Sequence, residues 1–67
     1  MNKLGERLEE LRTEKGLTKT QLAEKLNLML HTIGRWERKE HMPNIDFIIM
    51  LSRFFGVTVG YMVGEEN

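Results

Sequence analysis

Three basic side chains, Arg35, Arg38 and Lys39, lie close together near the end of the stretch Leu26–Lys39. Guanidinium and ammonium groups bind phosphates, and an arginine can also donate two parallel hydrogen bonds to a guanine base. Placed on one exposed helix face, these side chains would bind an acidic polymer. The spacing therefore favours a helix that contacts a nucleic acid.

The first half of the same stretch is apolar where such a segment is normally polar, since Leu28, Met29 and Leu30 follow one another. Apolar side chains at the start of a helix can contact the methyl group of thymine, so they are compatible with DNA binding. Alternatively, they cover a flank of the domain or a partner protein. The residues themselves leave both interpretations open.

Enzymatic chemistry has little support in the sequence. Ser52 is the only serine and lies within an expected helix, and the only histidines are His31 and His41. No glycine-rich phosphate loop occurs, and no carboxylate or second histidine lies at helical spacing from His31. Cysteine is absent. We therefore expect neither an enzyme nor a metal site, and no cofactor or small-molecule ligand.

Length and composition are typical of one small folded domain, residues 1–67. Hydrophobic residues make up 40% and charged residues 30%, with 10 basic and 10 acidic side chains. The charge is polarised: residues 18–44 carry five basic and three acidic side chains, a net +2, whereas residues 45–67 carry a net −2. No signal peptide or membrane span is visible, which favours a cytoplasmic protein whose middle segment meets a polyanion.

The sequence of the first half of the chain predicts short helices. Leucines four and three positions apart predict a helix over residues 3–15, which Gly16 ends. Thr18 followed by Gln21 is the pattern of a capping box and begins a second helix over residues 19–26.

A turn and a third helix follow. Asn27 can adopt the left-handed conformation that ends the second helix. The third helix is expected at about residues 30–39, with Ile33 and Trp36 on its buried face. Four residues are then expected to face outward, namely His31, Gly34, Arg35 and Arg38. Ala23 is small enough for the third helix to cross closely over the second helix. Residues 19–38 therefore predict a helix-turn-helix.

The second half of the chain adds two more helices. Asn44 caps a fourth helix that Gly56 ends, and Thr58 caps one last short turn. One stripe of the fourth helix is expected to face the core, namely Ile45, Ile48, Leu51 and Phe55. A second apolar side indicates either a thicker core or, as we favour, a homodimer. The expected dimer interface consists of Phe47, Met50, Phe54, Tyr61 and Val63.

The chain resembles the Cro/repressor-type, or xenobiotic-response-element, helix-turn-helix family over nearly its whole length. The resemblance rests on "LGERLEELRTEKGLTKTQLAEKL", "TIGRWER", a loop containing proline and "FFGVTVGYMVG", in that order. It implies a compact, all-α, five-helix lambda-repressor-like domain that binds a palindromic double-stranded DNA operator as a dimer and regulates transcription, in most cases as a repressor. It also implies a cytoplasmic, nucleoid-associated protein of bacterial or phage origin. Such a protein is either free-standing or the N-terminal domain of a longer regulator.

The resemblance also implies roles for individual residues. Base contacts fall on Leu30, His31 and Arg35, to which we add Met29, and an internal ion pair is implied between Arg12 and Glu37. Phosphate contacts are expected from Thr18, Lys19, Arg38, Lys39 and Asn44, with His41 as a weaker candidate.

Several positions depart from the family pattern. Met29 replaces a short hydroxyl residue that caps the third helix, Leu30 replaces a polar residue, and Lys39 stands where glycine is usual. The alternative function is therefore a protein-interaction module, antitoxin-like or an adaptor, that uses the apolar Leu28–Leu30 edge.

Overall fold

The computed structural model describes residues 2–67, so Met1, which the expected domain includes, lies outside the described residues. Five α-helices and no strand occur in the described chain. The helices are α1 (Leu4–Glu14), α2 (Lys19–Leu26), α3 (Thr32–Glu37), α4 (Ile45–Phe55) and α5 (Val59–Val63). The expected all-α, five-helix fold is confirmed. No helix within residues 2–67 combines the length and the apolar character needed to cross a membrane.

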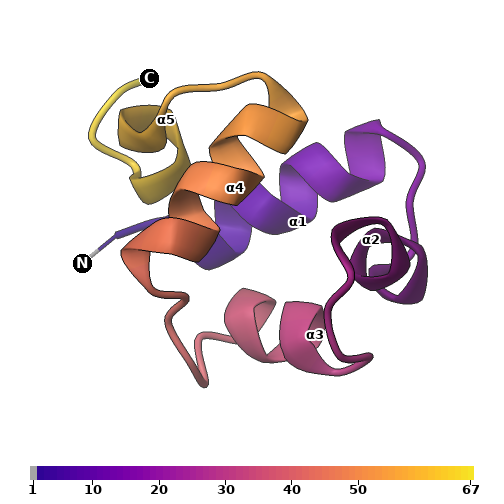
Figure 1. The fold of residues 1–67 in the computed structure, drawn as a ribbon. Helices are drawn as coiled ribbons and strands as arrows, with labels where there is room; N and C mark the ends of the chain where they lie inside the picture. The colour runs from indigo at the N-terminus through magenta and orange to yellow at the C-terminus, as the bar shows by residue number, and fades with distance from the viewer. Residues whose placement is uncertain (1) are drawn as a thin grey trace.

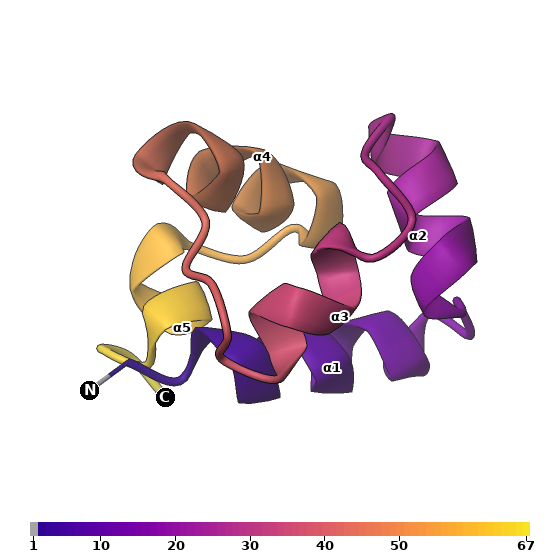
Figure 2. The same cartoon turned by 90° about the horizontal axis from the view of Figure 1, so that it is seen from below.

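The helices surround one apolar core to which all five contribute. Figure 1 shows α3 at the lower edge of the molecule, beside α2, with α1 and α4 above it. Figure 2, turned by 90°, shows α1 running along the bottom, with α3 over its middle and α2 beside α3. The chain ends lie close together, since the backbone N–H of Lys3 donates to the carbonyl of Val63 at 3.0 Å. The buried apolar residues are Leu4, Leu8, Leu22, Ala23, Ile33, Trp36, Ile48, Leu51 and Met62.

The helix ends expected from single residues are confirmed. Thr18 and Gln21 form the reciprocal capping box at the start of α2, with distances of 2.9 and 3.0 Å. Asn27 ends α2 with φ of 58°, a left-handed conformation that asparagine tolerates better than most residues. The side chain of Asn44 accepts a hydrogen bond from the backbone N–H of Phe47 and so caps α4.

The expected bounds of the third helix are too wide. Helix α3 begins at Thr32 rather than near Leu30, because Leu30 and His31 form a turn and no side chain caps the helix start. It ends early because Lys39 has φ of 65°. The N–H groups of Lys39 and Glu40 donate to the carbonyls of Trp36 and Arg35, the pattern of a Schellman motif.

One residue of the expected core stripe of α4 is not in the core. Ile45 is 59% exposed, whereas Ile48 and Leu51 are buried and Phe55 packs partly against the core. Side chains on a helix lean toward its N-terminus, so the side chain of the first residue extends past the end of the helix. The apolar spacing therefore predicts one buried residue too many, namely Ile45.

Candidate nucleic-acid interface

A buried ion pair fixes α3 to α1. Nε of Arg12 donates to Glu37 Oε2 at 2.7 Å and Nη2 donates to Oε1 at 3.2 Å, while Nη1 donates to the carbonyl of Leu17 at 2.7 Å. The two side chains are only 9% and 5% exposed. The hydrogen bond to Glu37 raises the pKa of Arg12 above its ordinary value, so the guanidinium stays charged in its buried position. The pair thereby orients the face of α3 that carries Arg35.

The four residues expected to contact bases are all on the surface. Met29 is 71% and Leu30 62% exposed, so neither of them closes the core. His31 and Arg35 are exposed as well, in the turn before α3 and on the helix itself. Within residues 2–67 Arg35 forms no ion pair, so its guanidinium is free for a ligand. Two apolar and two polar side chains are thus exposed between residues 29 and 35, where Ile33 and Gly34 are buried.

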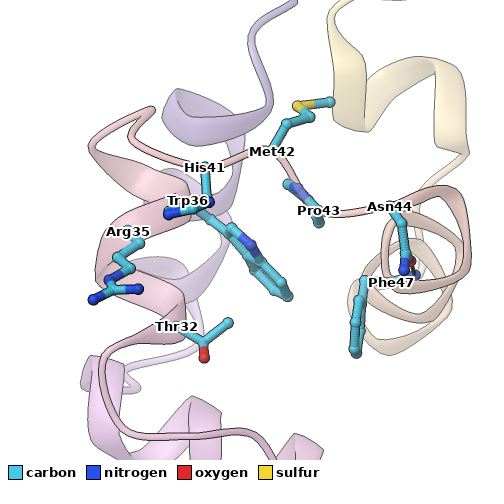
Figure 3. Close-up of a pocket in the computed structure, with 8 residues that line it drawn as sticks. All are labelled: Thr32, Arg35, Trp36, His41, Met42, Pro43, Asn44 and Phe47. Carbon is cyan, nitrogen blue, oxygen red and sulfur yellow. Dashed lines mark hydrogen bonds between the residues drawn. The ribbon is translucent and has the colours of Figure 1, made fainter.

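An open groove of about 330 Å³ separates α3 from the loop before α4. Figure 3 shows Trp36 extending from α3 toward Phe47 of α4, with Arg35 pointing away on the other side of α3. The rings of Trp36 and Phe47 lie 5.5 Å apart and form an apolar floor. Polar side chains at the rim come from Thr32, Arg35, His41 and Asn44. Sequence reasoning missed Thr32, because only tertiary contact between α3 and α4 creates this groove.

The start of α2 places a cation beside free backbone donors. The hydroxyl oxygen of Thr18 accepts from Gln21, and Lys19 follows as the first residue of the helix. Lys19 is exposed and takes part in no ion pair within the described chain. The positive end of the helix dipole and the ammonium group both favour an anion such as phosphate.

Two of the other expected phosphate ligands are paired with carboxylates. Nε of Arg38 donates to Glu40 at 2.7 Å, and this hydrogen bond lowers the pKa of the Glu40 carboxyl below its ordinary value. The ammonium of Lys39 lies 3.8 Å from a carboxylate oxygen of Glu6. All of these side chains are more than half exposed, so each pair is weak. Asn44 uses its carbonyl oxygen to cap α4, which leaves its N–H₂ group as the part able to donate.

Gly34, expected to stand outward, is buried beneath the side chains of exposed residues. A Cβ atom placed on it would lie 2.9 Å from Nη1 of Arg38 and 3.7 Å from Cδ of Lys19. These two long side chains therefore cover the glycine, which has no side chain of its own to project past them.

The residues expected at a dimer interface are half-buried in the single chain. Phe47, Phe54 and Val63 pack against the core of their own domain. One face of the Tyr61 ring is covered by the guanidinium of Arg7, 3.9 Å from the ring centre. The second apolar side of α4 is thus used partly for internal packing.

Comparison with known proteins identifies relatives of this arrangement. A family model described as helix-turn-helix matches residues 8–62. The chain is 40% identical to the HTH-type transcriptional activator BcrR of Enterococcus faecalis, over 92% of the chain and 30% of that protein. It is 35% identical to the HTH-type transcriptional regulator ImmR of Bacillus subtilis and to the immunity repressor protein of Bacillus phage phi105, each over 96% of the chain. The matches span 50% and 44% of those two proteins, so the chain corresponds to half or less of each of these relatives.

A solved structure shows the same fold. The structure of a transcriptional regulator from Listeria innocua superposes with a TM-score of 0.89 at 30% identity, over 100% of this chain and 63% of that one. None of these relatives is named as an enzyme. The matched family model, the five-helix arrangement and the helix-turn-helix at residues 19–37 together show that this chain belongs to the Cro/repressor-type helix-turn-helix family.

Proposed function

We propose that this chain binds double-stranded DNA sequence-specifically as a homodimer and represses transcription at a palindromic operator. In this proposal α3 enters the major groove, which is about 12 Å wide and admits a single helix. The observation that carries it is the set of exposed side chains of Met29, Leu30, His31 and Arg35. The Arg12–Glu37 pair holds α3 in place, and Lys19 lies at the start of α2. The relatives named as transcriptional regulators, among them a phage immunity repressor, support the assignment.

We assign base contacts and phosphate contacts to individual residues from the chemistry of their side chains. Arg35 donates two hydrogen bonds to the O6 and N7 atoms of a guanine, and His31 donates to a base edge. Leu30 and Met29 contact thymine methyl groups. Phosphates are bound by Thr18, Lys19, Arg38, Lys39 and Asn44, which place the helix but read no sequence.

Titration of a random-sequence duplex at several salt concentrations tests DNA binding without knowledge of the operator. Each neutralised phosphate releases counterions, so log Kd is expected to depend on log salt with a slope of about 0.9 per contact. Binding that is unchanged between about 50 and 200 mM salt would contradict the proposal.

The exposure of Met29 and Leu30 favours one alternative, a protein-interaction module that uses this apolar edge. Two variants separate the functions. Under the DNA-binding proposal Arg35→Ala weakens binding to the operator, whereas an interaction module tolerates this change. In the alternative, Leu30→Glu abolishes partner capture, and Arg35→Ala on α3 then serves as the control at a nearby exposed position.

A further inference from the structure

We propose that Gly34 is a positioning residue for phosphate binding, because its missing side chain lets Arg38 lie across α3 and meet Lys19. The inference rests on the proposed DNA binding and adds a function for a residue inside the helix. Glycine in a helix interior is less favourable than alanine, so a helix of only six residues carries a cost at this position.

The guanidinium of Arg38 occupies the space that a side chain at position 34 would fill. Arg38, the C-cap residue of α3, follows Gly34 by about one turn, and its Nη1 atom lies 2.9 Å from the position that a Cβ of residue 34 would occupy. A Cβ atom essentially never comes so close to another heavy atom, so any side chain here would displace the guanidinium. The same position is 3.7 Å from Cδ of Lys19, whose ammonium group is two bonds further on.

The guanidinium is oriented so that one nitrogen remains available. Nε and Nη2 of Arg38 donate to the two carboxylate oxygens of Glu40, at 2.7 and 3.4 Å. Nη1, the third nitrogen, is the one that lies over Gly34 on the side of Lys19. The guanidinium of Arg38 and the aliphatic chain of Lys19 therefore both lie against Gly34, which leaves the Lys19 ammonium within two bonds of this place. Like charges repel unless an anion lies between them. A backbone phosphate of DNA is the anion that the proposed function supplies.

The atoms near Gly34 also predict that the protein tolerates a methyl group there. The contacts around the added Cβ come from the far end of one flexible side chain and the aliphatic part of another, not from backbone. Gly34→Ala is therefore expected to fold, and to raise the melting temperature by about 4 °C because alanine favours the helix. Stability and DNA affinity are then expected to change in opposite directions.

The test is a double-mutant cycle of wild type, Gly34→Ala, Arg38→Ala and the double variant, titrated with a random-sequence duplex over a range of salt. Gly34→Ala is expected to weaken binding about fivefold, the value of one exposed ionic contact. It should also reduce the log–log salt slope by about 0.9, since one phosphate contact is lost. In the Arg38→Ala background the same change should have almost no effect, because the displaced group is already absent. Arg53→Ala, which removes an equal charge from the exposed face of α4, is the matched control.

Two results would overturn the inference while leaving the proposed function standing. One is a Gly34→Ala variant that binds the duplex as tightly as wild type. The other is an equal loss of affinity with and without Arg38, which would mean that the helix and not the guanidinium was disturbed. If wild type itself shows no salt-dependent binding, DNA binding fails and this inference fails with it.

Discussion

At the scale of single residues, Glu40 opposes the proposed contact with phosphate. Its carboxylate accepts two hydrogen bonds from Arg38, and that pairing lowers its pKa below the ordinary value. Glu40→Gln is therefore expected to increase affinity for a random duplex and to steepen the salt dependence, since one negative charge near the DNA is removed. Fluorescence anisotropy with a labelled duplex measures both quantities.

The control for this prediction is thermal stability. Both side chains of the Arg38–Glu40 pair are more than half exposed, so Glu40→Gln should leave the melting temperature almost unchanged. Weaker binding by Glu40→Gln would show that the carboxylate assists Arg38 and does not compete with DNA.

Unlike the exposed Arg38–Glu40 pair, the buried Arg12–Glu37 pair is expected to stabilise the fold. Glu37→Ala leaves the guanidinium of Arg12 buried without its carboxylate and is expected to cost about 3 kcal/mol of unfolding free energy. Urea denaturation followed by circular dichroism measures the loss. Replacing both residues with leucine should cost less than the single change, because no unpaired charge remains. A loss well under 1 kcal/mol for Glu37→Ala would show that water solvates the arginine.

At the scale of the elements, the end of α3 contains a residue in an unfavourable conformation. Lys39 has φ of 65°, a region where residues other than glycine pay roughly 1 kcal/mol. Lys39→Gly is therefore expected to raise the unfolding free energy by about 1 kcal/mol, since the ion pair lost with Glu6 is exposed and weak.

Asn27, the other non-glycine residue with positive φ, provides the comparison. Asparagine adopts this conformation at lower cost than lysine, so Asn27→Gly should stabilise the protein less than Lys39→Gly. Equal gains measured by thermal denaturation would argue against conformational strain at Lys39.

The same elements show what sequence reasoning can determine. Gly16, Thr18, Asn27 and Asn44 were placed correctly because a helix cap is decided by one residue and its immediate neighbours. The expected end of α3 is wrong because Lys39 adopts a conformation that its residue type disfavours, and the expected start is wrong because Leu30 and His31 form an uncapped turn.

The sequence predicts the exposure of individual side chains less well than it predicts the positions of the helices. Gly34 is buried because Lys19 and Arg38 fold over it, and Ile45 is exposed because it begins α4. Both outcomes depend on how side chains from different elements meet. The cationic residues are expected on the surface, but spacing does not identify Glu6 of α1 as the carboxylate that Lys39 contacts.

At the scale of the whole molecule, the proposed homodimer depends on a surface that the single chain already uses in part. Of the expected interface residues, Met50 is half-buried but does not belong to the apolar cluster around the core. Met50→Glu is therefore expected to shift a dimer toward monomer in analytical ultracentrifugation while the fold is kept. Phe47→Glu would also disrupt the contact with Trp36, so its effects on folding and on association could not be separated.

DNA binding by the Met50→Glu variant provides a second test of the proposed homodimer. Loss of dimerisation by Met50→Glu should weaken binding to a duplex with two half-sites and leave binding to one half-site unchanged. A wild-type protein that is monomeric alone and on the two-half-site duplex would contradict the dimer.

Under the proposed function, the exposed side chains of Met29, Leu30, His31 and Arg35 read base sequence. Selection of bound duplexes from a random pool tests this most directly. Wild type is expected to enrich a motif with twofold symmetry and half-sites about 10 base pairs apart. The same selection with Arg35→Ala should lose the preference for one guanine in each half, a discrimination of about 1–3 kcal/mol. A pool without an enriched motif, or an identical motif from Arg35→Ala, would contradict the account.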